Sequence, residues 1–314
     1  MNKIFHFCVM ALAALVAAGL PLGCGSSKSS PSSPSSPAPT FNYALDYFFG
    51  SSGPETLYAP QGIRLSGGLL WVGNNGPNSL QAWTTGGAFS DSVTQTWSGS
   101  SFGGPSGIGI GPDGYVYVSD IGNEQVEVFN SVGHGYLNFG HTQLGGDYPE
   151  GVAVNSTYVY VVDYPGAQVI RFTISGTGAF KSYVSPVTFG TISTSGTLGT
   201  LSTPTNVNLD SQGNVYVADH TKQAIMKYNY AGVFQAAVTA PGLTYPADVA
   251  FDGSGNLYVP DEINQDVQVI SASGAAVTTF GSASTLNDPD GVVLDSSDNC
   301  YVLCENQIVV FNKQ

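Results

Sequence analysis

Few residues of this chain could take part in chemistry, and the most informative ones follow a repeated proline. Six segments open with Pro-x-x-Val or Pro-x-x-Ile, at intervals of 42 to 55 residues. The residue directly after the proline differs from segment to segment: Gln61, Ser106, Glu150, Thr205, Ala247 and Asp290. Function in repeat proteins tends to reside where the repeats diverge. We therefore expect these variable residues to border a binding site.

Other patterns that could support chemistry are scarce. Beyond the N-terminal segment the histidines are His134, His141 and His220, and none occupies a variable position. No nucleophile elbow, Cys–His pair or Gly-rich phosphate loop occurs in a strand-to-helix context. The formal net charge of −14 disfavours nucleic-acid binding, which depends on Lys and Arg that neutralise phosphates. The same acidity is compatible with attraction of cations or basic partners.

Cys300 and Cys304 are expected to be buried, apolar thiols. They lie four residues apart on one predicted strand, so their Cα atoms are separated by about 13 Å. A disulfide spans at most about 7 Å between Cα atoms. These two cysteines therefore cannot pair with each other within that strand.

The interval between the prolines predicts repeated four-stranded units. In the second unit the expected strands are residues 108–110, 115–118, 125–129 and 136–139, with a Gly-Pro-Asp-Gly turn between the first two. The second strand of each unit is almost wholly apolar, which indicates cover on both faces. Radially packed blades provide that cover. We predict an all-β fold, a six-bladed β-propeller of four-stranded antiparallel blades.

The last unit contains only three predicted strands before the chain ends at Gln314. Residues 44–50, near the other end of the domain, have the pattern of the fourth strand at residues 135–140. An N-terminal strand that completes the last blade would close the ring and leave no unpaired edge. The propeller is thus predicted to span residues 41–314.

The residues that end the second strands form a set of similar groups: Asn74, Asp120, Asp163, Asp219, Asp261 and Cys304. Six such groups could form a collar of carboxylates. A residue required once per blade is more typical of a structural cap that accepts backbone hydrogen bonds. We interpret Asp120, Asp163, Asp219 and Asp261 as caps, and we consider Gln61, Ser106, Thr205 and Asp248 as candidates for the mouth of the central channel.

The N-terminal residues predict export. Residues 1–24 have the positive start and apolar run of a secretory signal, and Cys24 follows a small residue, as in the bacterial lipobox. Residues 25–40 are rich in Ser and Pro and are expected to act as a flexible tether. We therefore expect Cys24 to be acylated and the propeller to be anchored at the bacterial cell envelope, at the outer rather than the inner membrane, in the periplasm or on the cell surface.

The blades resemble the NHL-repeat β-propellers. The resemblance is carried by Pro149-Glu150-Gly151-Val152-Ala153-Val154 and by Val215-Tyr216-Val217-Ala218-Asp219. Pro289-Asp290-Gly291 also resembles an element of the gluconolactonase and senescence-marker propellers, whose Asp binds a divalent metal. That distant resemblance implies Asp290 and Glu150 as oxygen ligands of Ca²⁺, which could polarise a lactone carbonyl.

Two functions follow as hypotheses. The favoured one is a non-enzymatic, monomeric, lipid-anchored module that binds a protein or a glycan, with the Gly/Ser/Thr-rich segment 188–203 as a candidate binding loop. The alternative is a divalent-cation-dependent, lactonase- or lyase-like enzyme with its site at the channel mouth. A purely structural envelope protein is a third possibility.

Overall fold

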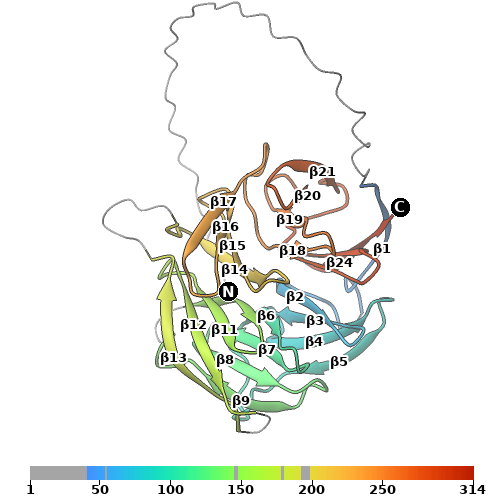
Figure 1. The fold of residues 1–314 in the computed structure, drawn as a ribbon. Coiled ribbons are helices and arrows are strands. Elements are labelled where there is room, and N and C mark those ends of the chain that lie inside the picture. Colours follow the sequence, from blue (N-terminus) through green and yellow to red (C-terminus); the bar gives the residue numbers. More distant parts are fainter. Residues whose placement is uncertain (1–40, 54, 145–147, 178–179, 192–198) are drawn as a thin grey trace, which may run out of the picture. The chain divides into compact units, whose positions relative to one another are not determined.

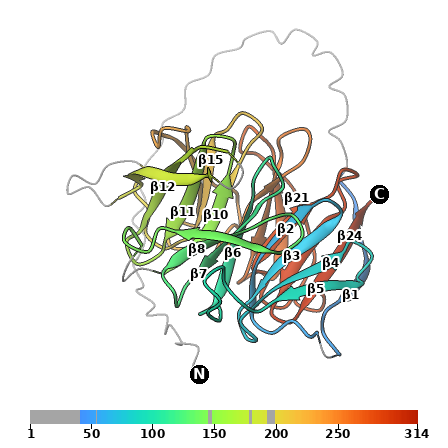
Figure 2. The ribbon, with the colours of Figure 1, turned by 90° about the horizontal axis from the view of Figure 1, so that it is seen from below.

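The computed structural model describes residues 41–53, 55–144, 148–177, 180–191 and 199–314. Its 24 strands form six four-stranded antiparallel sheets. Figure 1 shows the sheets arranged around a common axis, with the first strands of the blades nearest the centre, and Figure 2 shows the same ring from the side. The predicted six-bladed propeller is confirmed. The predicted signal, Cys24 and the tether lie outside the described residues.

The blades are numbered in chain order, each from its innermost strand outward. Blade 1 consists of β2 (Pro60–Ser66), β3 (Leu69–Asn74), β4 (Ser79–Thr84) and β5 (Phe89–Val93). Blade 2 consists of β6 (Pro105–Ile110), β7 (Val116–Asp120), β8 (Gln125–Phe129) and β9 (Gly135–Phe139). Blade 3 consists of β10 (Pro149–Val154), β11 (Tyr158–Asp163), β12 (Gln168–Ser175) and β13 (Ser182–Phe189). Blade 4 consists of β14 (Pro204–Leu209), β15 (Val215–Asp219), β16 (Ala224–Tyr228) and β17 (Phe234–Val238). Blade 5 consists of β18 (Ala250–Phe251), β19 (Leu257–Asp261), β20 (Asp266–Ile270) and β21 (Ala276–Phe280). Blade 6 consists of β22 (Gly291–Leu294), β23 (Cys300–Cys304), β24 (Gln307–Lys313) and β1 (Tyr43–Phe49).

The N-terminal strand completes the last blade. β1 pairs with β24 in antiparallel register, from Tyr43 opposite Lys313 to Phe49 opposite Ile308. Aromatic side chains of β1 also bridge the seam: Tyr43 stacks on Phe280 of blade 5 at 4.3 Å, and the Phe49 ring lies 5.6 Å from that of Trp83 in blade 1. The first and last segments of the propeller are thus joined in one sheet, as predicted.

The hydrophobic core lies between neighbouring blades. One buried cluster joins Tyr160 and Val162 of blade 3 to Val215 and Met226 of blade 4, and equivalent clusters join other neighbouring pairs. Every residue of β7, β15, β19 and β23 is buried. Burial on both faces explains why the second strands are almost wholly apolar before their last residue. Cys300 and Cys304 lie on β23 as buried free thiols.

The innermost strands pack very closely around the axis. A Cβ atom at Gly107 would collide with the backbone of Glu150 in the next blade, and one at Gly151 would collide with Asn206. These openings therefore require glycine because neighbouring backbones leave no room for a side chain. In blades 4 and 5 the same position carries Asn206 and Asp248 instead.

The long interval in blade 3 has two sources. β12 and β13 have eight residues each, which lengthens the outer hairpin. The segment predicted as a loop from residue 188 begins inside a strand, because Thr188 and Phe189 belong to β13, and residues 192–198 lie outside the described part. Among the described residues, no helix is long and apolar enough to cross a bilayer.

Candidate functional site at the channel mouth

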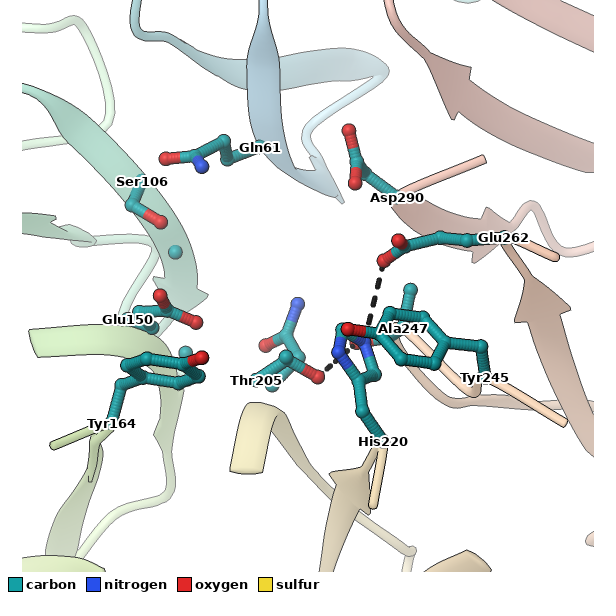
Figure 3. A pocket seen from close by; sticks show the side chains of 13 residues that line it. Gln61, Ser106, Glu150, Tyr164, Thr205, His220, Tyr245, Ala247, Glu262 and Asp290 are labelled. Atoms are coloured by element: carbon teal, nitrogen blue, oxygen red, sulfur yellow. Dashed lines mark hydrogen bonds and ion pairs between the residues drawn. The ribbon is translucent and has the colours of Figure 1, made fainter. Parts of the chain in front are cut away.

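All six variable residues lie together around one pocket of about 210 Å³ at the end of the axis where the inner strands begin. Gln61, Ser106, Glu150, Thr205, Ala247 and Asp290 each come from a different blade, and Figure 3 shows them around the opening. The sequence therefore located this site through divergence at one repeat position. Asp248, the remaining candidate, is not among the lining residues.

A local irregularity of the inner strands accompanies this arrangement. In blades 1 to 4 the opening proline pairs with the last residue of the second strand, and the register then shifts before regular pairing resumes, as between Pro105 and Ile108. Such a β-bulge re-aims the side chains beside it. The variable residue follows the proline directly, so the bulge explains how the repeated backbone presents a different side chain from each blade.

Besides two glycines, five further lining residues were not predicted: Tyr164, Asn206, His220, Tyr245 and Glu262. Tyr164, His220 and Glu262 each follow a cap aspartate directly. Their backbone N–H groups donate to the residue before the opening proline, as from Tyr164 to Tyr148 and from Glu262 to Tyr245. This recurring bond holds the residue after the cap beside the channel mouth. Comparison of that position across the repeats could have found these side chains.

His220 and Glu262 form the most closely placed ionisable pair of the pocket. The Nε2 atom of His220 lies 3.3 Å from a carboxylate oxygen of Glu262, and the imidazole stacks on the Tyr245 ring at 3.6 Å (Figure 3). The ion-pair contact lacks hydrogen-bond geometry, so Nε2 is buried without a hydrogen-bond partner among the described residues. His220 is only 8% exposed. A buried polar atom in a pocket wall is costly unless a ligand or water satisfies it.

Glu150 faces the same pocket and has an unusual titration. Burial, with a further contribution from the negative charge of Glu262, raises the pKa of Glu150 to about 8. No described residue donates a hydrogen bond to its carboxylate. The lining contains Asp290 as a third carboxylate and, among the described residues, no Lys or Arg. The pocket is therefore acidic and lacks a permanent positive charge of its own.

Asp248 lies inside the channel rather than on the pocket wall. Arg64 of blade 1 reaches across the axis and donates hydrogen bonds to both carboxylate oxygens of Asp248, at 2.8 and 3.2 Å, and to Oδ1 of Asn206 at 3.3 Å. Asp248 is fully buried and Arg64 nearly so. Because Asn206 also lines the pocket, this cluster adjoins it, and the positive charge of Arg64 is neutralised by Asp248.

The cap aspartates are fully buried and hold the loops around the mouth. Asp120 accepts from the N–H of Gly103, and Asp219 accepts from the N–H groups of Ser202, Thr203 and Lys222. Asp261 accepts equivalent bonds from Thr244 and Asn264, and Asp163 accepts from the N–H of Gly166. Asp219 and Asp261 thus serve both the turn that follows the cap and the loop that leads into the inner strand.

The donors do not form a recognisable metal centre. Within the described residues, no group of three or more His, Cys, Asp or Glu side chains is arranged to hold a metal ion. Asp290 and Glu150 line the same pocket, and the calcium site implied for them stays a prediction. No chemistry is derived below through a bound metal.

No protein-family model and no curated protein matches the chain. The fold resembles solved structures. A streptogramin B lyase has a TM-score of 0.62 and 13% identity, over 87% of this chain and 98% of that one. A candidate gluconolactonase has a TM-score of 0.61 and 12% identity, over 88% of this chain and 93% of that one. A protein of unknown function from Bacteroides thetaiotaomicron has a TM-score of 0.64 and 16% identity, over 84% of this chain and 72% of that one.

These likenesses confirm the propeller architecture. At 12–16% identity they show the fold alone, because one fold can carry many functions. The NHL assignment stays a prediction, and so does any activity at the channel mouth.

Proposed function

We propose that this chain is a binding module whose channel mouth holds a ligand with a protonated amine. The observation that carries the proposal is the convergence of Glu150, Glu262 and Asp290 in one pocket whose lining includes no Lys or Arg among the described residues. With its pKa raised to about 8, Glu150 is mostly protonated at neutral pH, and an opposite charge in the pocket would stabilise its ionised form together with the carboxylates of Glu262 and Asp290. A cationic group in the pocket would supply that charge.

The remaining lining side chains suit the same ligand. Nε2 of His220 has no hydrogen-bond partner among the described residues, and when the proton resides on Nδ1 it can accept from an ammonium group that also contacts Glu262. The rings of Tyr164 and Tyr245 border the pocket, and aromatic faces attract cations. The net charge of −14 also favours the approach of positive ligands. A volume of about 210 Å³ admits one small group, such as the amine end of a larger molecule.

The setting of this function follows from the N-terminal sequence. A secretory signal, a lipobox-like Cys24 and a Ser/Pro-rich tether support an exported, lipid-anchored module at the bacterial cell envelope. Its partner would be a protein or glycan that carries a free amine. Labelling the lipid anchor with a fatty-acid analogue, in wild type and in Cys24→Ser, tests this part: label in the wild type alone is expected, and an unlabelled wild type would contradict it.

The binding proposal is tested with 1,5-diaminopentane and its uncharged analogue 1,5-pentanediol. We expect the diamine to raise the melting temperature of the full chain and the diol to leave it unchanged, since a ligand that binds only the folded state stabilises it. The shift should shrink at high salt because exposed charges are screened. Equal effects of the two compounds, or none, would contradict the proposal.

A second candidate function is catalysis by proton transfer at the same pocket. The specific observation is a carboxyl group, Glu150, whose pKa of about 8 lies near neutral pH, beside the His220–Glu262 pair. Groups tuned in this way serve as general acids or bases. The structural likeness to a lyase and to a candidate gluconolactonase is compatible with this candidate.

Turnover of gluconolactone and of a streptogramin B, each with and without calcium, tests this candidate. Under it, Glu150→Gln should lower turnover by about a hundredfold or more, because the variant cannot exchange a proton. The matched control is Asp91→Asn, which removes an exposed carboxylate on β5. Absence of turnover by the wild-type chain on both substrates would remove the candidate.

A further inference from the structure

Blade 3 departs from the other blades in its two outer strands. β12 and β13 have eight residues each, whereas the corresponding strands of blades 2, 4 and 5 have five (Figure 1). The longer hairpin reaches blade 2, where Lys181 forms an ion pair with Asp113 and the Tyr183 hydroxyl donates to that of Tyr117 at 3.0 Å. The longer outer hairpin of blade 3 thus forms a surface together with blade 2.

This surface lies at the end of the axis opposite to the channel mouth. The inner strands begin at the mouth, so the turns that follow them lie at the other end. The turn at residues 155–157 is flanked by two hollows, one of about 410 Å³ toward blade 2 and one of about 650 Å³ toward blade 4. Val154, Asn155 and Ser156 line both hollows. We call the two together the blade 3 groove.

Tyrosine rings line both halves of the groove. Tyr115 borders the first hollow, where the neighbouring Tyr117 ring is fully buried, and Tyr158 and Tyr230 border the second. The Tyr158 and Tyr230 rings are nearly parallel, 12° apart, with centroids at 6.4 Å. The Arg171 guanidinium lies over Tyr158 at 4.5 Å and donates to the backbone oxygen of Tyr230 at 2.8 Å, which fixes this pair in place. Even so, Tyr230 stays 58% exposed.

The Lys and Asp side chains of the groove are paired with one another. Lys181 is paired with Asp113 and lies 4.5 Å from the centre of the Tyr115 ring. Asp210 accepts hydrogen bonds from its own turn and from Asn214, and Lys227 lies 4.0 Å away. Apart from the Arg171 guanidinium, which contacts the Tyr158 ring and a backbone oxygen, the groove therefore offers little net charge to an ionic ligand. In this respect it differs from the acidic channel mouth.

Uncharged polar groups lie between the two sets of rings. The side-chain carbonyl of Asn155 accepts from the N–H groups of Thr157 and Tyr158, both at 2.8 Å. The same side chain also hydrogen-bonds with the Tyr160 hydroxyl, so this amide is held in place within the protein. Ser156, Ser211 and Gln212 are exposed on the same walls. Aromatic faces together with amide and hydroxyl groups match a ligand that has apolar ring faces and hydroxyl edges.

We propose that the blade 3 groove binds a neutral polysaccharide. Pyranose rings present C–H faces that pack on tyrosine, and their hydroxyls exchange hydrogen bonds with amides and hydroxyls. Two aromatic hollows on either side of one turn suit a chain of several sugars. This site is separate from the channel mouth, so it stands whether or not an amine binds there.

The test is the retardation of the full chain in native gels that contain dextran, glucomannan or a mixed-linkage β-glucan. We expect at least one of these to slow the wild type. Tyr230→Ala and Tyr158→Ala should weaken the retarding interaction by about tenfold, the loss expected for one aromatic contact. Tyr148→Ala is the matched control, because Tyr148 is also an exposed tyrosine but precedes the opening of β10 at the opposite end.

Gels with alginate distinguish neutral from acidic polysaccharides, and the proposal expects no retardation by alginate. Tyr230 has an exposed ring, so Tyr230→Ala is expected to fold, and its melting curve verifies this. Retardation by none of the neutral polysaccharides would overturn the proposal. So would equal retardation of folded Tyr230→Ala and the wild type.

Discussion

At the scale of single residues, comparison of the repeats predicted some of the pocket residues and missed others. Glu150 and Asp290 were found because they break the pattern at one repeat position. His220 and Glu262 were missed because they lie directly after cap aspartates, a position that was not compared across the repeats. Their placement depends on hydrogen bonds between the turn after the cap and the loop before the proline. Such tertiary contacts have no local signature.

Asp248 is the opposite case, a residue that was predicted at the channel mouth but does not line the pocket. Its place in an opening suggested the channel mouth, yet the carboxylate is buried and paired with Arg64, a residue 184 positions earlier. A buried Asp is costly unless a positive partner compensates it. The sequence contains both residues but not the fact that β2 and the opening of blade 5 face each other across the axis.

Asp266 carries a testable pH dependence of stability. It lies opposite Asp261 in the β19–β20 pair, and its Oδ1 is buried without a hydrogen-bond partner among the described residues. Burial, with the charge of Asp261 as a smaller cause, raises the pKa of Asp266 from 3.8 to about 6. The folded state thus holds this proton more tightly than the unfolded state.

For that reason, this carboxyl should lower the free energy of unfolding as pH rises from about 4 to about 6, with no further change above. We expect Asp266→Asn to abolish this decrease and to stabilise the protein at pH 7 by about 1–2 kcal/mol. Denaturant unfolding between pH 4 and pH 8 measures it, with Asp91→Asn as the exposed control. A variant whose stability falls with pH as steeply as the wild type would refute the explanation.

At the scale of elements, the strands of the second unit were predicted to within three residues at each end. Turn residues and apolar runs encode these strands locally. The eight-residue strands of blade 3 were not foreseen. Six residues of Ser182–Phe189 are exposed and one of them is Pro186, so this segment lacks a clear strand pattern. The longer hairpin is held by contacts with blade 2, which local patterns do not report.

The close packing of the inner strands predicts a strong effect of one methyl group. Gly107→Ala would place a Cβ against the backbone of Glu150, so we expect the free energy of unfolding to fall by about 2–3 kcal/mol. Gly253→Ala is the matched control, because a Cβ there meets no atom within 4 Å. Chemical denaturation of both variants provides the measurement. Equal stability of Gly107→Ala and the control would show that the inner strands can move apart.

At the scale of the whole molecule, the propeller was predictable for two reasons. The Pro-x-x-Val or Pro-x-x-Ile opening occurs six times, and the missing strand of the last blade occurs at the other end of the domain. A closed ring then brings six variable residues to one opening. The ligand could not be predicted in the same way. It depends on the sum of charges in a pocket to which all six blades contribute, and only the assembled ring shows that three carboxylates meet there without Lys or Arg among the described lining residues.

The central claim is that this acidic mouth binds a protonated amine, and titration calorimetry with 1,5-diaminopentane tests it most directly. The dissociation constant would be compared between the wild type, Glu262→Gln and the charge-matched control Asp91→Asn. Loss of one carboxylate from the pocket should weaken binding by about tenfold, whereas the control should bind as the wild type does. Equal affinities of Glu262→Gln and the wild type, or no binding by any of the three, would contradict the account.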